Sequence, residues 1–400
     1  MGELGAPAGV LIVGGGVAAL ETMMALRDLA GDRLQATLVA PEPDFVYQPM
    51  AVLEPFGLGE AGRYPLQRIT EDFGAALVRG GVAAVDPRAR RVVLDSGDTL
   101  GYEHALVLAP GARTRPALDD ALTFTGTGSA AAMRALLDDL GRWRVRRIAF
   151  VAPEAAGWTL PLYELALLTA RHAVARDLVV ELILITPEPR PLALFGDDAS
   201  AAVANLLAVA GVEFCGASHV EVGQEGIRLH PKGRSLRVER VVALPLVRGR
   251  ELEGVPADPD SGFIPVDEHG RVEGLDDVYC AGDATNFPIK QGGLAAQQAD
   301  AVAEQIAAGI GAEVAPSPFR PVLRGMLFTG DVDQFMVARG RGAGRAATRP
   351  LWWPPTKIAG RYLAPYLHER EPDAMPGPPP EGFTDLELPL DANGAAPTGL

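Results

Sequence analysis

The residues best suited to chemistry at the start of the chain are the glycines of Gly14-Gly15-Gly16-Val17-Ala18-Ala19, which follow an apolar run at residues 10–13. Gly14 permits a tight turn, and Gly16 lets a phosphate approach the backbone closely. Ala19 keeps the following helix near the strand, and the free N–H groups at the start of that helix attract an anion. The spacing therefore predicts a dinucleotide-binding loop, with contacts from Gly14, Gly16, Val17, Ala18 and Ala19.

Two later segments carry groups that suit the same kind of ligand. Cys280-Ala281-Gly282-Asp283 follows an apolar strand-like run, so that Gly282 admits a phosphate and the carboxylate of Asp283 can accept hydrogen bonds from the hydroxyls of a flavin side chain. Ala109-Pro110-Gly111 follows another apolar run and is typical of a strand that ends in a turn. The glycine loop alone does not separate NAD from FAD, whereas this set of segments favours FAD.

In this order and spacing, the three motifs resemble those of flavoproteins with two dinucleotide-binding domains, over about residues 8–325. Residues 38–49 and 288–298 are similar to the branch that contains type II NADH:quinone dehydrogenases and sulfide:quinone oxidoreductases. The resemblance implies an FAD-dependent enzyme that passes two electrons from a small donor to a quinone-like or other small acceptor. It also implies cofactor contacts from Glu42, Val82, Ala109, Gly111, Gly282, Asp283, Gly292, Gly293 and Leu294.

The same resemblance places two side chains at the reacting end of the flavin. Lys290 would lie at the flavin edge, the alternative being an ordinary surface lysine. Gln298, and after it Gln297, fall where the branch lines its acceptor pocket. In that branch the helix after residue 290 points its N-terminus at the flavin, where its dipole favours an anionic reduced ring.

Two positions depart from the family pattern. The acid that usually ends the second strand is replaced by Ala40, so we expect Glu42 to reach the ribose instead. The loop after residues 147–151 reads Ala152-Pro153-Glu154-Ala155-Ala156-Gly157, where NADH-using members have several glycines. Pro153 removes an N–H group and Glu154 adds a negative charge, so NAD(P)H binding is doubtful.

The cysteines exclude two activities of related proteins. Cys215 and Cys280 are the only cysteines, and neither lies where sulfide-oxidising relatives carry their reactive pair. A redox disulfide near residue 50 is also missing, which excludes disulfide reduction. We interpret both thiols as buried and inert.

The elements that position these residues alternate between strands and helices. Strands are expected at 10–13, 34–39, 77–84, 90–95, 105–108, 147–151, 178–185, 226–246, 262–266 and 278–281, and helices at 17–30, 160–174 and 293–308. This alternation predicts an α/β fold of two Rossmann-like dinucleotide-binding domains, each three-layered, with a small C-terminal domain.

The expected boundaries follow from the motifs. The FAD-binding domain takes residues 1–118 and 249–320, and a NAD(P)-binding-like domain with a degenerate loop takes 119–248. Residues 321–370 would cap the flavin, and the Pro/Gly-rich stretch 371–400 reads as an irregular tail.

The region 340–370 mixes arginines with Trp352, Trp353, Tyr362 and Tyr366. Aromatic and basic residues together suit peripheral membrane contact, and the alternatives are a hairpin and helix packed over the flavin or a dimer contact.

The composition of the chain argues against several other classes of protein. A net charge of −15 argues against sequence-independent nucleic-acid binding, and the six histidines do not cluster at metal-ligand spacing, so no metal site is expected. The N-terminus lacks the basic region of a signal peptide, and no apolar run is long enough to span a membrane. We expect a cytoplasmic protein, with the inner face of the membrane as a peripheral location and a homodimer as the default assembly.

A function of another class fits the same residues. Because the loop at 152–157 is degenerate, the chain could instead be a non-catalytic FAD-binding redox sensor or scaffold subunit that has lost its NAD(P)H site.

Overall fold

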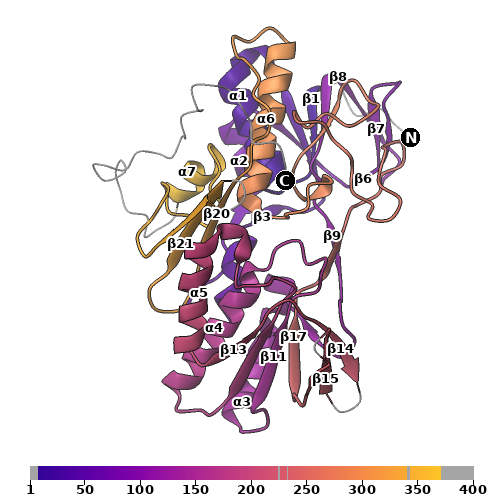
Figure 1. The fold of residues 1–400 in the computed structure, drawn as a ribbon. Coiled ribbons are helices and arrows are strands. Elements are labelled where there is room, and N and C mark those ends of the chain that lie inside the picture. Colours follow the sequence, from indigo (N-terminus) through magenta and orange to yellow (C-terminus); the bar gives the residue numbers. More distant parts are fainter. Residues whose placement is uncertain (1–7, 224–225, 232, 340–342, 371–400) are drawn as a thin grey trace.

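The computed structural model describes residues 8–223, 226–231, 233–339 and 343–370. Two α/β units lie one above the other, with a smaller C-terminal unit beside the junction between them (Figure 1). The expected tail 371–400 lies outside the described residues.

The first unit is built on a sheet in the order β5-β2-β1-β8-β7-β6, with β19 added beside β8. Strands β5, β2, β1, β8 and β19 are parallel, whereas β6, β7 and the start of β8 form an antiparallel layer. The bounds are β1 (Ala8–Val13), β2 (Ala36–Ala40), β5 (Ala76–Arg79), β6 (Val82–Asp86), β7 (Arg91–Leu94), β8 (Thr99–Leu108) and β19 (Val278–Cys280).

The alternation of side chains along β1 produces the three layers of this unit. Val10 and Ile12 face helices α1 (Val17–Ala30) and α6 (Gly292–Gly309), which pack against each other on one side of the sheet. Leu11 and Val13 face the opposite way, into a core shared with β6 and β7. Because all four are apolar, the strand must be buried on both faces.

The second unit repeats this plan. Its five strands are parallel in the order β10-β17-β11-β12-β13, with bounds β10 (Leu122–Thr123), β11 (Arg147–Val151), β12 (Glu181–Ile185), β13 (Val212–Cys215) and β17 (Arg240–Ala243). Helices α3 (Ala130–Gly141), α4 (Leu160–Ala175) and α5 (Asp197–Val209) cover one face. The antiparallel strands β14 (His219–Gly223), β15 (Gly226–His230) and β16 (Ser235–Leu236) cover the other.

Short connecting segments hold the units together. A two-stranded ribbon of β9 (Arg113–Arg115) and β18 (Leu246–Arg248) links the first unit to the second. The hairpin β3 (Asp44–Val46) and β4 (Arg63–Pro65) leads into α2 (Leu66–Asp72).

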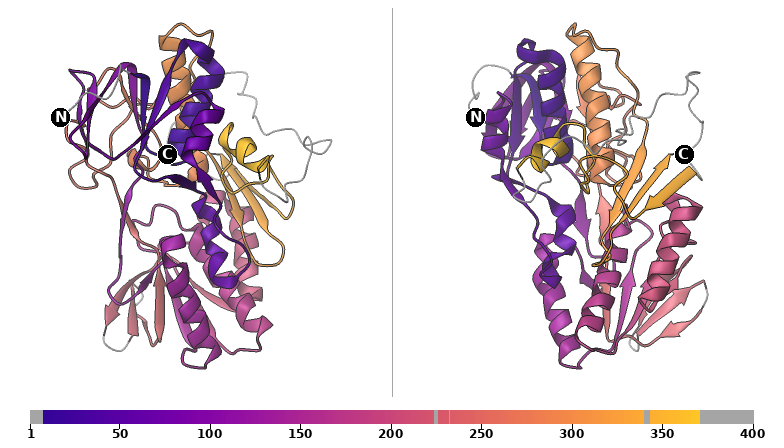
Figure 2. Two further views of the ribbon diagram at one scale, coloured as in Figure 1. Left: turned by 180° about the vertical axis from the view of Figure 1, so that it is seen from behind. Right: turned by 90° about the vertical axis from the view of Figure 1, so that its left-hand side faces the viewer.

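The C-terminal unit is an antiparallel sheet of β20 (Val322–Leu327), β21 (Gln334–Arg339) and β22 (Ala343–Ala347), followed by α7 (Leu363–His368). The sheet packs on α4, α5 and α6, and α7 packs on α1 (Figure 2).

The predicted α/β class and the two Rossmann-like domains are confirmed, and three element predictions need correction. The strand expected from residue 178 begins at Glu181, and the strand expected at 262–266 is reduced to isolated bridges at Ile264 and Val266. The strand expected at 77–84 is divided into β5 and β6. Helices α2, α3 and α5 were not predicted.

Candidate functional site

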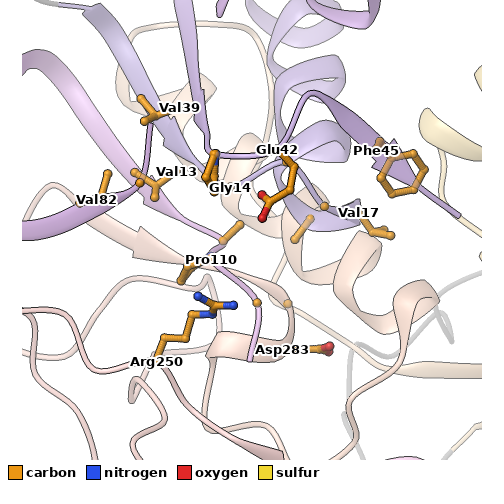
Figure 3. Close-up of a pocket in the computed structure, with 18 of the residues that line it drawn as sticks. Val13, Gly14, Val17, Val39, Glu42, Phe45, Val82, Pro110, Arg250 and Asp283 are labelled. Carbon is orange, nitrogen blue, oxygen red and sulfur yellow. The ribbon is translucent and has the colours of Figure 1, made fainter. Parts of the chain in front are cut away.

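A long cavity of about 690 Å³ opens where β1, β2 and β8 end and α1 and α6 begin (Figure 3). Parallel strands bring their carboxyl ends to one edge of a sheet, which is the usual ligand site in this architecture. The predicted residues that line the cavity are Gly14, Gly16, Val17, Ala18, Glu42, Val82, Ala109, Gly111, Gly282, Asp283 and Gly292.

The glycine loop presents bare backbone to this cavity. Gly14 has φ +124°, and a Cβ at this position would lie 2.1 Å from the carbonyl oxygen of Ala109, so no other residue fits. A Cβ on Gly16 would meet nothing within 4 Å. Gly16 also caps α1 without a side-chain hydrogen bond to the first turn, so the N–H groups there are free to bind an anion.

The Gly-Asp pair joins the glycine loop from the far end of the sequence. Strand β19 lies beside β8, and a Cβ on Gly282 would come within 3.0 Å of the Ala18 side chain. The carboxylate of Asp283 lines the cavity (Figure 3). Its burial raises the pKa of Asp283, and the positive charge of Lys290 partly opposes that rise. The two motifs therefore face the same ligand space.

Charged groups of both signs surround the remainder of the cavity. Glu42 lies just beyond the end of β2 and points into it (Figure 3). Arg113 and Arg250, which the sequence analysis did not single out, also line it. Within the described part of the chain, neither guanidinium has an ion-pair or hydrogen-bond partner, so both are available to an anionic ligand. Arg113 begins β9 and Arg250 follows β18, and these positions at the linker strands were the only feature of the sequence that could have pointed to the two arginines.

Five predicted residues do not line this cavity, and one of them, Lys290, is described with the second cavity below. Ala19 is a buried residue of the first turn of α1. Gly293 and Leu294 lie in the first turn of α6 and face the protein interior. The side chain of Gln298 accepts the N–H of Gly282 at 2.7 Å and contacts the hydroxyl of Thr285. Gln298 thus fixes the Gly-Asp turn, contrary to the expectation that it lines an acceptor pocket.

A second cavity of about 290 Å³ adjoins the first at Gln48 and Gly292, which line both. Its wall is mainly apolar and comes from all three units of the molecule, whereas charged groups of both signs line the first cavity. We call the first the polar cavity and the second the apolar cavity. The apolar and aromatic wall residues are Pro49, Val52, Phe124, Ala156, Trp158, Leu160, Pro161, Leu244, Pro245, Met326 and Ile358.

Lys290 lies in the wall of this apolar cavity. The ammonium group donates to the carbonyl of Thr285 at 2.6 Å and lies 3.6 Å from the centre of the Phe263 ring. Burial lowers the pKa of Lys290 to about 8, although the nearby carboxylate of Asp283 favours the charged form. Lys290 is therefore a half-buried cation near the junction of the cavities, not a surface lysine.

Lys357, which lines the apolar cavity, belongs to a buried ion pair. Lys357, from the segment between β22 and α7, places its ammonium 2.5 Å and 2.7 Å from the two carboxylate oxygens of Glu164 on α4. Glu164 is fully buried and also accepts the N–H of Phe328. Burial raises the pKa of Glu164 and lowers that of Lys357, and each partner opposes the other's shift.

The degenerate loop after β11 lies beside the same cavity. Gly157 has φ +74°, and a Cβ there would come within 2.9 Å of the Lys290 side chain. Glu154 is exposed, with its carboxylate 3.8 Å from His219 of β14. Pro153 and Glu154 thus occupy the turn where the second Rossmann unit would receive a dinucleotide.

Both cysteines and two of the C-terminal aromatic residues are buried. Cys215 and Cys280 are both free thiols inside the protein, as predicted. In the region proposed for membrane contact, Trp352 and Tyr366 are buried and Trp353 and Tyr362 are partly buried, which favours the alternative of a packed hairpin and helix. No described helix is long and apolar enough to cross a bilayer. No metal-binding cluster of His, Cys, Asp or Glu occurs among the described residues.

Comparison with known proteins gives one family match. Residues 8–303 match the model of the pyridine nucleotide-disulphide oxidoreductase family. No curated protein sequence matches.

Solved structures show the same fold at low sequence identity. The sulfide:quinone oxidoreductase of the hyperthermophilic bacterium Aquifex aeolicus superimposes with a TM-score of 0.76 at 20% identity, over 85% of this chain and 87% of that one. The ferredoxin reductase of the CYP199A2 system of Rhodopseudomonas palustris gives a TM-score of 0.63 at 20% identity, over 82% of both chains. A NAD-dependent persulfide reductase from A. fulgidus gives 0.61 at 18% identity, over 84% of this chain and 65% of that one.

Proposed function

The chain belongs to the pyridine nucleotide-disulphide oxidoreductase family, and from that membership we propose that it is an FAD-dependent oxidoreductase that passes two electrons from a small donor to a quinone-like or other small organic acceptor. The flavin would lie along the polar cavity, and the exchanging molecules would use the apolar one.

The residues of the polar cavity fit FAD. Gly14 and Gly16 leave room for phosphates at a helix N-terminus, and Asp283 offers a buried carboxylate to hydroxyl groups. Arg113 and Arg250 supply two unpaired positive charges for a diphosphate, and Glu42 can accept hydrogen bonds from a ribose. When bound, FAD supplies a centre that takes up and releases two electrons.

The observation that carries the proposal is the direct contact between the two cavities. They share Gln48 and Gly292, and the first turn of α6 lies at that junction. A cofactor in the polar cavity would therefore present one end to a chamber whose wall is mainly apolar. Electron exchange with an apolar molecule requires such proximity.

The character of the second cavity supports a flat, apolar reactant. Trp158, Phe124 and Met326 provide aromatic and sulfur contacts, which bind conjugated rings well. Sulfide is not proposed as the donor, because the two thiols of this chain are buried away from the apolar cavity. A quinone acts in the Aquifex protein, as its name states, and the same acceptor class is proposed here.

A quinone that takes up two electrons also takes up two protons. Two sites in the cavity wall can hold protons: the Lys290 ammonium, whose pKa is about 8, and the Lys357–Glu164 pair. We propose that Lys290 orients the reactant through its charge, and that the ion pair keeps an exchangeable proton in the wall.

Reduced nicotinamides are proposed to be poor donors. Pro153 lacks an N–H group and Glu154 brings a negative charge to the turn that would face the dinucleotide. Trp158 lies between this turn and α4 in the sequence, and its side chain lines the apolar cavity. The donor is then a small molecule without a diphosphate.

An anaerobic flavin-reduction screen tests the proposal. The flavin-loaded protein is mixed with NADH, NADPH, quinols, small thiols or sulfide, and the flavin absorbance is followed. Bleaching by a small donor, followed by recovery on adding a quinone, supports an electron-transferring enzyme. Rapid bleaching by NADH would reject the nicotinamide part of the proposal. A flavin that no donor reduces would favour the redox-sensor or scaffold alternative.

A further inference from the structure

The second unit exposes an apolar and basic edge at the end far from both cavities. Strands β11, β12 and β13 are parallel, so their first residues lie along one edge of the sheet. Helices α3, α4 and α5 immediately precede these strands and must end at the same edge, at the lower end of the molecule in Figure 1. We call this surface, comprising residues 141–147, 174–180 and 209–211, the distal edge.

Large apolar side chains gather there without cover. Among the described residues, Val209, Val174 and Val179 are the three most exposed large hydrophobic side chains, at 81%, 79% and 71%. Trp143, which is 50% exposed, lies at the same edge. Isolated exposed apolar residues are normal on soluble proteins, whereas several together at one edge indicate an interaction surface.

The backbone of Trp143 is difficult to explain by folding alone. It has φ +60° directly after the end of α3, a position that favours glycine and strains a bulky side chain. The side chain does not gain burial in return, because half of it faces solvent. A strained, exposed tryptophan is therefore more readily explained by a partner that covers it.

The charges beside Trp143 identify the kind of partner. The segment Arg142-Trp143-Arg144-Val145-Arg146-Arg147 has four arginines and no acid, in a chain with a net charge of −15. Arg144 pairs with Asp139, and Arg147 pairs with Glu181. Arg146 lies 5.4 Å from the Trp143 ring.

The other acids of this edge only partly balance these charges. Glu239 accepts the backbone N–H groups of Arg146 and Arg147. Asp138 and Asp177 face solvent near Arg142 and Arg176. The loop that follows α3 is therefore basic, although the whole chain is acidic. A two-fold contact between copies of the chain would place the arginines of one loop against those of the other.

We propose that the distal edge docks peripherally on an anionic phospholipid surface, with Trp143 inserted at the headgroup level and Arg142 and Arg146 facing lipid phosphates. Tryptophan and arginine favour this interface because one part of each side chain is apolar and another is polar or charged. The exposed valines at the ends of α4 and α5 add apolar area at the same edge. Arginines near such a surface contribute about fivefold each to binding at moderate ionic strength.

The experiment uses the full-length flavin-loaded protein and sedimented vesicles. Vesicles of phosphatidylcholine and phosphatidylglycerol in equal parts are compared with vesicles of phosphatidylcholine alone. We expect binding to the anionic vesicles only, with a blue shift of tryptophan emission and a loss of binding in high salt.

Trp143→Gly separates docking from folding. Glycine relieves the positive φ, so the melting temperature should stay the same or rise, while vesicle binding falls about tenfold. Arg142→Gln with Arg146→Gln should weaken binding by about twentyfold. Leu194→Ala and Arg88→Gln, at exposed positions away from this edge, serve as matched controls and should bind as the parent does.

Three outcomes would overturn the proposal. The first is equal binding of parent and Trp143→Gly, and the second is equal binding to neutral and anionic vesicles. The third is the absence of vesicle binding together with a dimer, measured by light scattering, that Trp143→Gly dissociates; that result would assign the edge to a protein contact.

Discussion

Lys290 is fixed by three neighbours of different kinds. Its ammonium donates to the Thr285 carbonyl, lies over the Phe263 ring and is close enough to Asp283 for mutual effects on pKa. Desolvation dominates, so the pKa falls to about 8 and the charge is lost within the range of ordinary assays.

A pH profile tests the role of that charge. Because the folded-state pKa is about 8, Lys290 is charged below this pH and becomes neutral above it. If the charge orients the acceptor, flavin reoxidation by a quinone should slow as pH rises through about 8. Lys290→Met should remove this inflection and leave a lower, flatter profile. An unchanged profile in the variant would show that another group titrates.

The two arginines of the polar cavity permit a test of cofactor binding. Arg250→Gln should raise the dissociation constant for FAD by about tenfold or more, because a charge-assisted hydrogen bond contributes roughly 1.5–3 kcal/mol. Riboflavin, which has no phosphate, should bind both proteins equally. Arg115→Gln is the control, since Arg115 is exposed and outside the polar cavity. Equal loss of riboflavin and FAD affinity would indicate general misfolding of the site.

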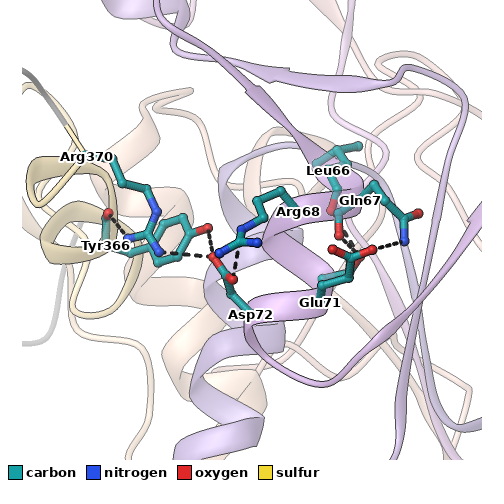
Figure 4. Close-up of polar contacts among 8 residues, drawn as sticks. Leu66, Gln67, Arg68, Glu71, Asp72, Tyr366 and Arg370 are labelled. Atoms are coloured by element: carbon teal, nitrogen blue, oxygen red, sulfur yellow. Dashed lines mark hydrogen bonds and ion pairs between the residues drawn. The ribbon is translucent and has the colours of Figure 1, made fainter.

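At the scale of elements, carboxylates of the first unit hold the C-terminal segment in place. Glu21 of α1 accepts the N–H groups of Tyr362 and Leu363 at the start of α7, at 2.8 Å each. On the other side, Asp72 of α2 contacts Tyr366 and Arg370 (Figure 4). These contacts fix α7 and, with it, the residues 357 and 358 that close the apolar cavity.

A buried acid near this segment, Asp300, predicts that the stability of the protein depends on pH. Burial raises the pKa of Asp300 well above its usual range, and Glu21 and Glu304 add to the shift while Arg361 opposes it. The folded state therefore binds a proton more tightly than the unfolded chain, and stability should fall as pH rises from the ordinary Asp pKa through the raised value.

Asp300→Asn should remove much of this slope. One carboxylate oxygen of Asp300 is buried without a hydrogen-bond partner, so the neutral amide avoids the cost of a buried charge at high pH. We expect the variant to gain about 1 kcal/mol or more at the alkaline end, since one unit of pKa shift corresponds to 1.36 kcal/mol. Melting temperatures across the pH range measure the effect. Parallel curves for parent and variant would contradict it.

At the scale of the whole molecule, one ion pair ties the C-terminal segment to the second unit. Lys357 and Glu164 are 193 residues apart in the sequence, yet their charged groups are buried together beside the apolar cavity. Removing one partner leaves the other charge buried without compensation.

Single and double substitutions separate the two contributions of this pair. Lys357→Met should destabilise the protein by about 3–5 kcal/mol in denaturant unfolding. Adding Glu164→Gln should restore most of the loss, because the amide is neutral and still accepts the N–H of Phe328. If the pair also stores a proton for the acceptor, the double variant should fold well yet reduce quinone slowly. Normal turnover in that variant would leave the pair a purely structural role.

The sequence by itself determined much of the first unit. The apolar run before Gly14, the small residues of the glycine loop and the Gly-Asp pair each satisfy a local requirement, so their types reveal their use. Helix α1 has the predicted bounds for the same reason. Helices α3 and α5 were missed although the apolar side chains of α3, Met133, Leu136, Leu137 and Leu140, repeat at helical spacing.

Only the tertiary structure decided the rest. Arg113 and Arg250 lie at a linker ribbon and face a cavity that forms only when segments far apart in the sequence of the first unit come together. Gln298 turned inward to the Gly282 N–H, and the C-terminal tryptophan Trp352 was buried, because packing, not residue type, sets which way a side chain faces. Local spacing encodes a backbone loop, whereas a pocket wall made from distant segments is encoded in no single stretch of the chain.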